Sequence, residues 1–186
     1  MADPKQALRD AMTKAGIDDP DERAGIAAIA GGESGFIPHT EVGYAHTPNA
    51  RIRLIFKNEV GTLSDDQLDD LKSDDRKFFD FVYGGRGGNR PGTDDGYTYR
   101  GRGPFQLTLR SNYQAVGAKI DQPLVDQPDL VNDVDIGSQS AVAYILLRYR
   151  GGGFEAMLDC VGWNAPDIYQ TKYALYQEFK ASGEFA

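Results

Sequence analysis

The chain has 186 residues, of which 40% are hydrophobic and 26% charged, so it can bury the core of one or at most two small domains. Its 20 Lys and Arg against 28 Asp and Glu leave a net charge of −8, which argues against a nucleic-acid partner bound by a broad basic surface. No apolar run approaches the roughly 18 residues that cross a membrane, which excludes stable membrane insertion. A single cysteine, Cys160, forms no intramolecular disulfide, and the first residues lack a signal-peptide pattern, so we expect synthesis and folding in the cytoplasm.

Helix-start signals recur along the chain. Asp3 and Asp19 each precede a proline and are expected to cap helices, the first ending near Gly16 and the second running into Gly31 and Gly32. Ser64 and Gln67 form a capping-box pattern. Further helices are expected over residues 45–56, 73–83, 111–117, 133–149, 153–160 and 167–179. Short strands are expected only at 97–99 and 105–107, which predicts a mainly α protein with a small β-hairpin.

Glu33 occupies an unexpected place on the second helix. It falls four residues after Ile29 and seven after Ile26, on the apolar stripe that faces the core. Burial and the negative end of the helix dipole both disfavour a charged carboxylate there. A carboxyl group that is neutral near pH 7 is what a general acid needs. The alternative is that the two glycines end the helix early and Glu33 is solvated.

A second carboxylate, Glu41, follows in a loop that contains Gly35 and Pro38. Such a loop lets two glutamates face each other across a cleft, and a pair of carboxyl groups is the usual equipment for cleaving a glycosidic bond. Taken alone, a loop glutamate is more often a surface charge.

Residues 97–108 read Tyr-Thr-Tyr-Arg-Gly-Arg-Gly-Pro-Phe-Gln-Leu-Thr. Gly101 and Gly103 permit close approach of the backbone or a positive φ. Gln106 and Thr108 alternate on one face of an extended segment, where they can present an amide and a hydroxyl to a ligand. The alternative is a tight hairpin whose arginines pair with nearby acids.

Together these motifs resemble glycoside hydrolase family 19, in the branch that includes phage endolysins, over roughly residues 20–180. The resemblance is carried by Glu33-Ser34-Gly35-Phe36 with Glu41 and Tyr44, by residues 78–85 with Gly88-Asn89, by residues 99–108 with Ser111-Asn112-Tyr113, and by Val161-Gly162-Trp163-Asn164 with Tyr173. It implies a lysozyme-like, mainly α (α+β) fold with a cleft between a larger and a smaller lobe. We expect one catalytic domain over residues 1–186, its smaller lobe at about 45–90, and no separate cell-wall-binding domain.

The resemblance also implies roles for single residues. Glu33 matches the general acid, Glu41 the second carboxylate, and Thr108 the hydroxyl that helps hold the attacking water. Substrate contacts are expected from Tyr44, Tyr99, Gln106, Asn112 and Asn164, the two tyrosines by stacking on sugar rings. The sequence departs from the family pattern in its shorter loop between the glutamates, in Val42-Gly43 and in Leu109, which stands where a glycine is usual.

We therefore expect an endolysin-type, lysozyme-like glycoside hydrolase (a muramidase) that cleaves peptidoglycan strands by inversion, without a metal or other cofactor. It is expected to be a monomer that waits in the cytoplasm and acts on the cell wall after lysis begins. The alternatives on the same fold are a chitinase, a lytic transglycosylase, an interbacterial toxin and a non-catalytic glycan-binding protein. The spacing of His39, His46 and Cys160 matches no compact zinc motif, which argues against a zinc amidase.

Overall fold

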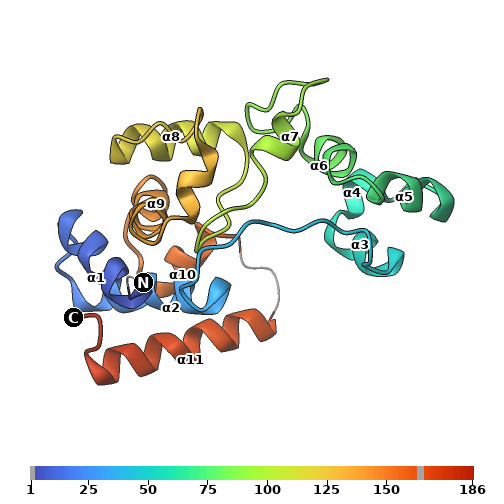
Figure 1. Cartoon of the computed structure of the whole chain (residues 1–186). Helices are drawn as coiled ribbons and strands as arrows, with labels where there is room; N and C mark the ends of the chain where they lie inside the picture. Colours follow the sequence, from blue (N-terminus) through green and yellow to red (C-terminus); the bar gives the residue numbers. More distant parts are fainter. Residues whose placement is uncertain (1–2, 163–165) are drawn as a thin grey trace.

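A computed structural model of the chain describes residues 3–162 and 166–186. Within these ranges the chain is mainly helical (Figure 1), which confirms the expected mainly α, lysozyme-like fold class. The helices are α1 (Pro4–Lys14), α2 (Pro20–Ser34), α3 (Asn49–Ile55), α4 (Lys57–Val60), α5 (Asp65–Lys72), α6 (Asp75–Tyr83), α7 (Asp95–Thr98), α8 (Arg110–Ile120), the 3-10 helix η1 (Pro128–Asn132), α9 (Val134–Leu146), α10 (Gly153–Asp159) and α11 (Pro166–Ser182). In the described ranges, no helix has both the length and the apolar composition that spanning a membrane requires.

The helix starts follow their capping residues. The carboxylates of Asp3 and Asp19 accept backbone N–H groups in the first turns of α1 and α2, and Ser64 and Gln67 form a complete capping box on α5. Helix α2 continues through its glycine pair and ends at Gly35, whose φ of 60° is left-handed. Glu33 therefore lies in the last turn of α2.

The strand expected at residues 97–99 is wrong, and the β-pairing is smaller than expected. Residues 95–98 are helical as α7, and the pairing that remains consists of two isolated bridges, Thr40 with Arg102 and Arg102 with Leu107. Positive φ angles at Gly103 (77°) and Gln106 (50°) interrupt any longer extended run. The bridges nevertheless join three short segments, at residues 39–41, 101–103 and 107, side by side.

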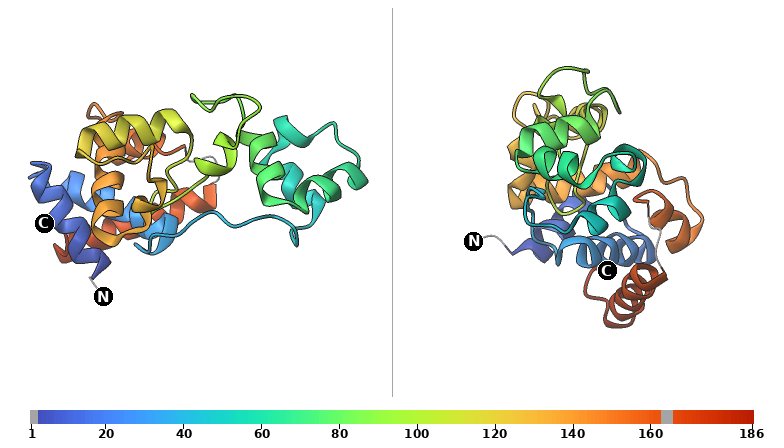
Figure 2. Two further views of the ribbon diagram at one scale, coloured as in Figure 1. Left: turned by 45° about the horizontal axis from the view of Figure 1, so that its top comes forward. Right: turned by 90° about the vertical axis from the view of Figure 1, so that its right-hand side faces the viewer.

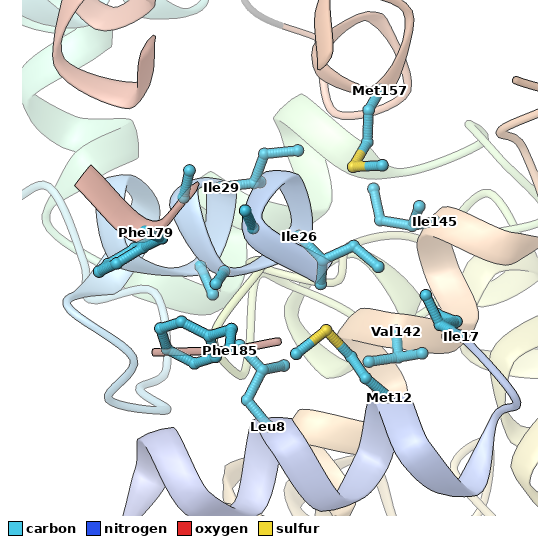
Figure 3. Packing of buried hydrophobic residues seen from close by; sticks show 14 of the residues in the cluster. Leu8, Met12, Ile17, Ile26, Ile29, Val142, Ile145, Met157, Phe179 and Phe185 are labelled. Atoms are coloured by element: carbon cyan, nitrogen blue, oxygen red, sulfur yellow. The ribbon is translucent and has the colours of Figure 1, made fainter. Parts of the chain in front are cut away.

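A larger lobe is built around α2 (Figure 3). Apolar side chains of α1, α9, α10 and α11 pack against those of α2, and α11 lies alongside α2 (Figure 1). The cluster includes Leu8, Met12, Ile17, Ile26, Ile29, Val142, Ile145, Met157, Phe179 and Phe185. This packing fixes the C-terminal helix against the end of α2 that carries Glu33.

A smaller lobe has its own apolar cluster, drawn from residues 44–97. Helices α3 to α6 hold it, away from α1, α2 and α11, and α6 packs against α7 (Figures 1 and 2). Its buried members are Ile52, Phe56, Val60, Leu68, Phe78, Phe79 and Val82. The segment after α2 crosses from the larger lobe to this one (Figure 1). Glu41 belongs to this segment, because it lies between Ser34 at the end of α2 and Asn49 at the start of α3.

Candidate active site

The carboxylate of Glu41 is held by donors from three segments of the chain. The Tyr44 hydroxyl donates to Oε1 at 2.9 Å, and the Tyr83 hydroxyl lies 3.2 Å from each of the two oxygens. The backbone N–H of Gly101 donates to Oε2 at 3.1 Å. Since Tyr83 ends α6 and Gly101 lies in the bridged segment, Glu41 stands where the smaller lobe meets residues 101–103.

Both tyrosines serve Glu41 as neutral donors. Burial, followed by the negative charge of Glu41, raises the pKa of the Tyr44 phenol well above its ordinary value, and the same two causes raise the pKa of Tyr83. The two hydroxyls therefore stay protonated throughout the pH range in which enzymes are normally active. The carboxylate is consequently fixed in position by charge-assisted hydrogen bonds.

The backbone of Glu41 is also tied to the arginine-glycine segment. Its N–H donates to the Gly101 carbonyl at 2.8 Å, and its carbonyl accepts from Arg100 Nε at 3.3 Å. A Cβ at position 101 would lie 2.7 Å from Gln106 Oε1 and 3.2 Å from Glu41 Oε2, so the site needs glycine there. Two motifs about 60 residues apart in sequence are thus brought into direct contact.

Gln106, Thr108 and Asn112 form a chain of polar contacts next to Glu41. Gln106 Nε2 donates to the carbonyls of His39 (3.0 Å) and Gly103 (3.1 Å). The Thr108 hydroxyl donates to the Gln106 carbonyl at 2.7 Å, and Asn112 Nδ2 donates to the Thr108 carbonyl, also at 2.7 Å. Their expected contacts to water and sugar stay predictions, because the structure shows these side chains bonded within the protein.

The two tyrosines expected to stack on sugars lie differently. The Tyr99 side chain is buried with 5% exposure, its ring lies 5.4 Å from that of Tyr113, and its hydroxyl donates to the Val125 carbonyl. This burial does not agree with stacking against a sugar. The Tyr44 ring packs on Phe78 at 5.0 Å in the smaller lobe, so its hydroxyl rather than its face reaches the site.

Glu33 forms an ion pair with Lys172, which the sequence analysis did not predict. Its carboxylate accepts from Lys172 Nζ of α11, and the side chain of Glu33 is 30% exposed whereas that of Lys172 is 3% exposed. The expectation that Glu33 faces an apolar core is therefore wrong. The apolar stripe is buried at Ile26 and Ile29, but at the last turn of α2 it meets a lysine.

Asn164 and Trp163 lie outside the described residues. Across residues 3–162 and 166–186, no three His, Cys, Asp or Glu side chains gather closely enough to hold a metal ion. Cys160 packs at the edge of the larger-lobe core, where burial raises the pKa of its thiol. A cavity of about 410 Å³ lies between α1, α8 and α9, and none of the candidate site residues lines it.

Comparison with known proteins supports part of this site. Residues 83–150 match the family model described as class I chitinase, of glycoside hydrolase family 19, which confirms the resemblance for that segment. The match contains Tyr83, Gly101 and residues 106–112 but neither Glu33 nor Glu41.

Curated relatives share a similarly short stretch. An acidic endochitinase of Petunia hybrida is 46% identical over 54 residues, which cover 28% of this chain and 21% of the relative. Acidic endochitinase Q of Nicotiana tabacum is 48% identical over 50 residues, covering 26% and 20%. An acidic 27 kDa endochitinase of Solanum lycopersicum is 44% identical over 54 residues, covering 28% and 22%. The chain thus spans about a fifth of the length of these relatives.

Proposed function

We propose that the protein is a glycoside hydrolase that cleaves the bonds between N-acetylglucosamine units of chitin. The observation that carries the proposal is the family match over residues 83–150, a segment that donates hydrogen bonds to Glu41. Tyr83 and Gly101 both lie within residues 83–150, and both donate to the Glu41 carboxylate. The three relatives reported above are named endochitinases, which favours chitin over the peptidoglycan expected from the sequence.

In the proposed reaction, Glu33 protonates the glycosidic oxygen that leaves. A protonated carboxyl keeps one oxygen as an acceptor and carries a single O–H donor. Lys172 can therefore remain bonded to one oxygen of Glu33 while the O–H on the other points to the substrate. Because the Glu33 side chain is 30% exposed, the second oxygen can meet a ligand that arrives from solvent.

Glu41, with the Thr108 hydroxyl, positions the attacking water in this proposal. The two tyrosines and the Gly101 N–H hold the carboxylate, which suits a group that must orient a water rather than move. Direct displacement by that water inverts the anomeric centre and requires carboxyl groups about 6.5–9.5 Å apart, whereas about 5 Å would favour retention.

Peptidoglycan cleavage by an endolysin is the second candidate. It shares N-acetylglucosamine with chitin, and a chain whose single cysteine allows no internal disulfide suits folding in a reducing compartment. A single product analysis on both polymers distinguishes the two candidates.

The test is a product analysis by mass spectrometry on a soluble chitin hexamer and on purified peptidoglycan. Wild type should shorten the hexamer, and Glu41→Gln should slow this by at least about 100-fold. Glu178→Gln is the matched control, because Glu178 is an exposed glutamate on α11. An intact hexamer after incubation with wild type would contradict the chitinase proposal.

The products from peptidoglycan separate the remaining alternatives. Reducing N-acetylmuramic ends would indicate a muramidase, reducing N-acetylglucosamine ends a cut at the other bond, and anhydro ends a lytic transglycosylase. Free peptides with intact sugar chains would indicate an amidase. Retained glycan binding without products from either polymer would indicate a non-catalytic glycan-binding protein.

A further inference from the structure

We infer that Lys172 is a positioning residue for Glu33, so that helix α11 forms part of the catalytic apparatus. The inference rests on the proposed function, because it assigns Lys172 a task in the reaction of Glu33. One part of it, the energetic coupling of the two side chains, is independent of any substrate.

The burial of the two partners differs tenfold. The Lys172 side chain is 3% exposed, and the side chain of Glu33 with which it pairs is 30% exposed. Lysine is almost never fully buried unless it is paired, because an isolated ammonium loses its hydration without compensation. The pairing with Glu33 therefore compensates for the burial of the Lys172 ammonium.

The backbone of α2 is shaped to admit the lysine. A Cβ at position 32 would lie 2.6 Å from Lys172 Cγ and 3.3 Å from its Cε. Glycine inside a helix costs roughly 0.5–1 kcal/mol relative to alanine, so its presence in the last turn of α2 needs a local reason. The approach of the Lys172 stem supplies that reason.

The position of Glu33 explains what the lysine does. Glu33 lies in the last turn of α2, just before the left-handed Gly35, and its flexible side chain would otherwise sample several rotamers. An ammonium fixed by the packing of α11 against α2 restricts the carboxyl group to one of them. A misplacement of about 1 Å at such a group can cost about 100-fold in rate.

The kinetic test compares three lysine variants on whichever glycan wild type cleaves. Lys172→Met should lower kcat by 10-fold to 100-fold while changing KM less than about threefold, and Lys172→Arg should recover part of the loss. Lys180→Met is the matched control, since Lys180 also joins α11 to α2 through Asp21, but its side chain is 38% exposed. It should stay within twofold of wild type. A kcat of Lys172→Met within twofold of wild type would overturn the positioning role.

The second test needs no substrate. It measures the unfolding equilibrium of wild type, Glu33→Gln, Lys172→Met and the double variant in urea. Glu33→Gln should destabilise more than Lys172→Met, because it leaves a buried ammonium with a weaker partner, whereas a Glu33 without its lysine can be hydrated. The double variant should lose less unfolding free energy than the sum of the two single losses.

The kinetic comparison and the unfolding cycle test different parts of the inference, so either can fail without the other. Additive single effects in the unfolding cycle would overturn the ion pair itself. A wild type inactive on both glycans would overturn the proposed function and the catalytic task of Lys172, while the cycle would still decide whether the pair exists.

Discussion

The hydroxyl of Tyr83 lies 3.2 Å from both carboxylate oxygens of Glu41, and it reaches them from the last residue of a helix in the smaller lobe. Glu41 itself belongs to the segment that leaves the larger lobe. The contact therefore makes the position of the second candidate carboxylate depend on how the smaller lobe is packed. A rigid aromatic cluster around Phe79, whose ring stacks on that of Tyr83 at 6.0 Å, provides that packing.

Replacing Tyr83 by phenylalanine should reduce activity without unfolding the protein. The ring and its stacking remain, but Glu41 loses a charge-assisted hydrogen bond of about 1.5–3 kcal/mol. We expect kcat/KM on the preferred glycan to fall by about 10-fold or more. Tyr173→Phe, on an exposed ring of α11, is the control and should leave kcat/KM unchanged. Equal values for Tyr83→Phe and Tyr173→Phe would show that the phenol does not serve Glu41.

Replacing Gly32 by alanine should separate stability from activity. Alanine favours a helix interior by about 1 kcal/mol, yet the new methyl group would press on the stem of Lys172. We expect stability in urea close to that of wild type and a lowered kcat. Gly31→Ala brings the same gain in helix propensity but meets the Phe36 ring instead, and it should lower kcat less. The reverse order of the two variants would exclude the proposed role of Gly32.

Acid should weaken the segment that leads into α7. Asp95 accepts three hydrogen bonds from Arg90, and chiefly this contact lowers the pKa of Asp95 from 3.8 to about 2. Since the folded pKa lies below the unfolded one, the stabilisation is present above pH 3.8 and is lost as the pH falls towards 2.

Asp95→Asn tests this dependence. It should cost about 1 kcal/mol at pH 7, a modest figure because the Arg90 side chain is exposed and screened. The difference from wild type should shrink between pH 4 and pH 2 in urea titrations. Asp94→Asn, which breaks an exposed pair with Arg76, should cost less at pH 7. A pH-independent difference for Asp95→Asn would contradict the assignment.

Alkali should weaken the core beneath the arginine-glycine segment. Burial raises the pKa of Tyr113 from 10.0 to about 12, and its hydroxyl donates to the Arg100 carbonyl at 2.8 Å. Because the folded pKa lies above the unfolded one, this stabilisation is complete below pH 10 and is lost as the pH rises towards 12. The loss attributable to Tyr113 is on the order of 1 kcal/mol at pH 11. Urea titrations of wild type and Tyr113→Phe at pH 9 and pH 11 should show a smaller fall in the variant, and parallel falls would contradict this account.

Helix boundaries were predictable where a local contact decides them. The caps at Asp3, Asp19 and Ser64 act on residues two or three positions away, so their sequence patterns carry the information. The elements α4, α7 and η1 were missed because four or five residues show no helical period.

The candidate site was predictable only in part, because its decisive contacts are long-range. Glu33 and Lys172 are 139 residues apart, and a lysine on a helix reads from sequence as a solvated charge. Tyr83 belonged to a recognised motif, but nothing local indicates that its hydroxyl reaches Glu41 across 42 residues. The burial of Tyr99 was not predictable, because an aromatic residue in a glycine-containing segment suits a ligand contact and a buried ring equally well.

Among the described residues, the apolar cluster around α2 and that of the smaller lobe share no side chain. Cooperative melting of such a chain must be transmitted by what connects them, and the carboxylate of Glu41, bonded to Tyr83 on one side and to Gly101 on the other, is one such connection. A heat-capacity scan of Glu41→Ala should therefore show two transitions where wild type shows one.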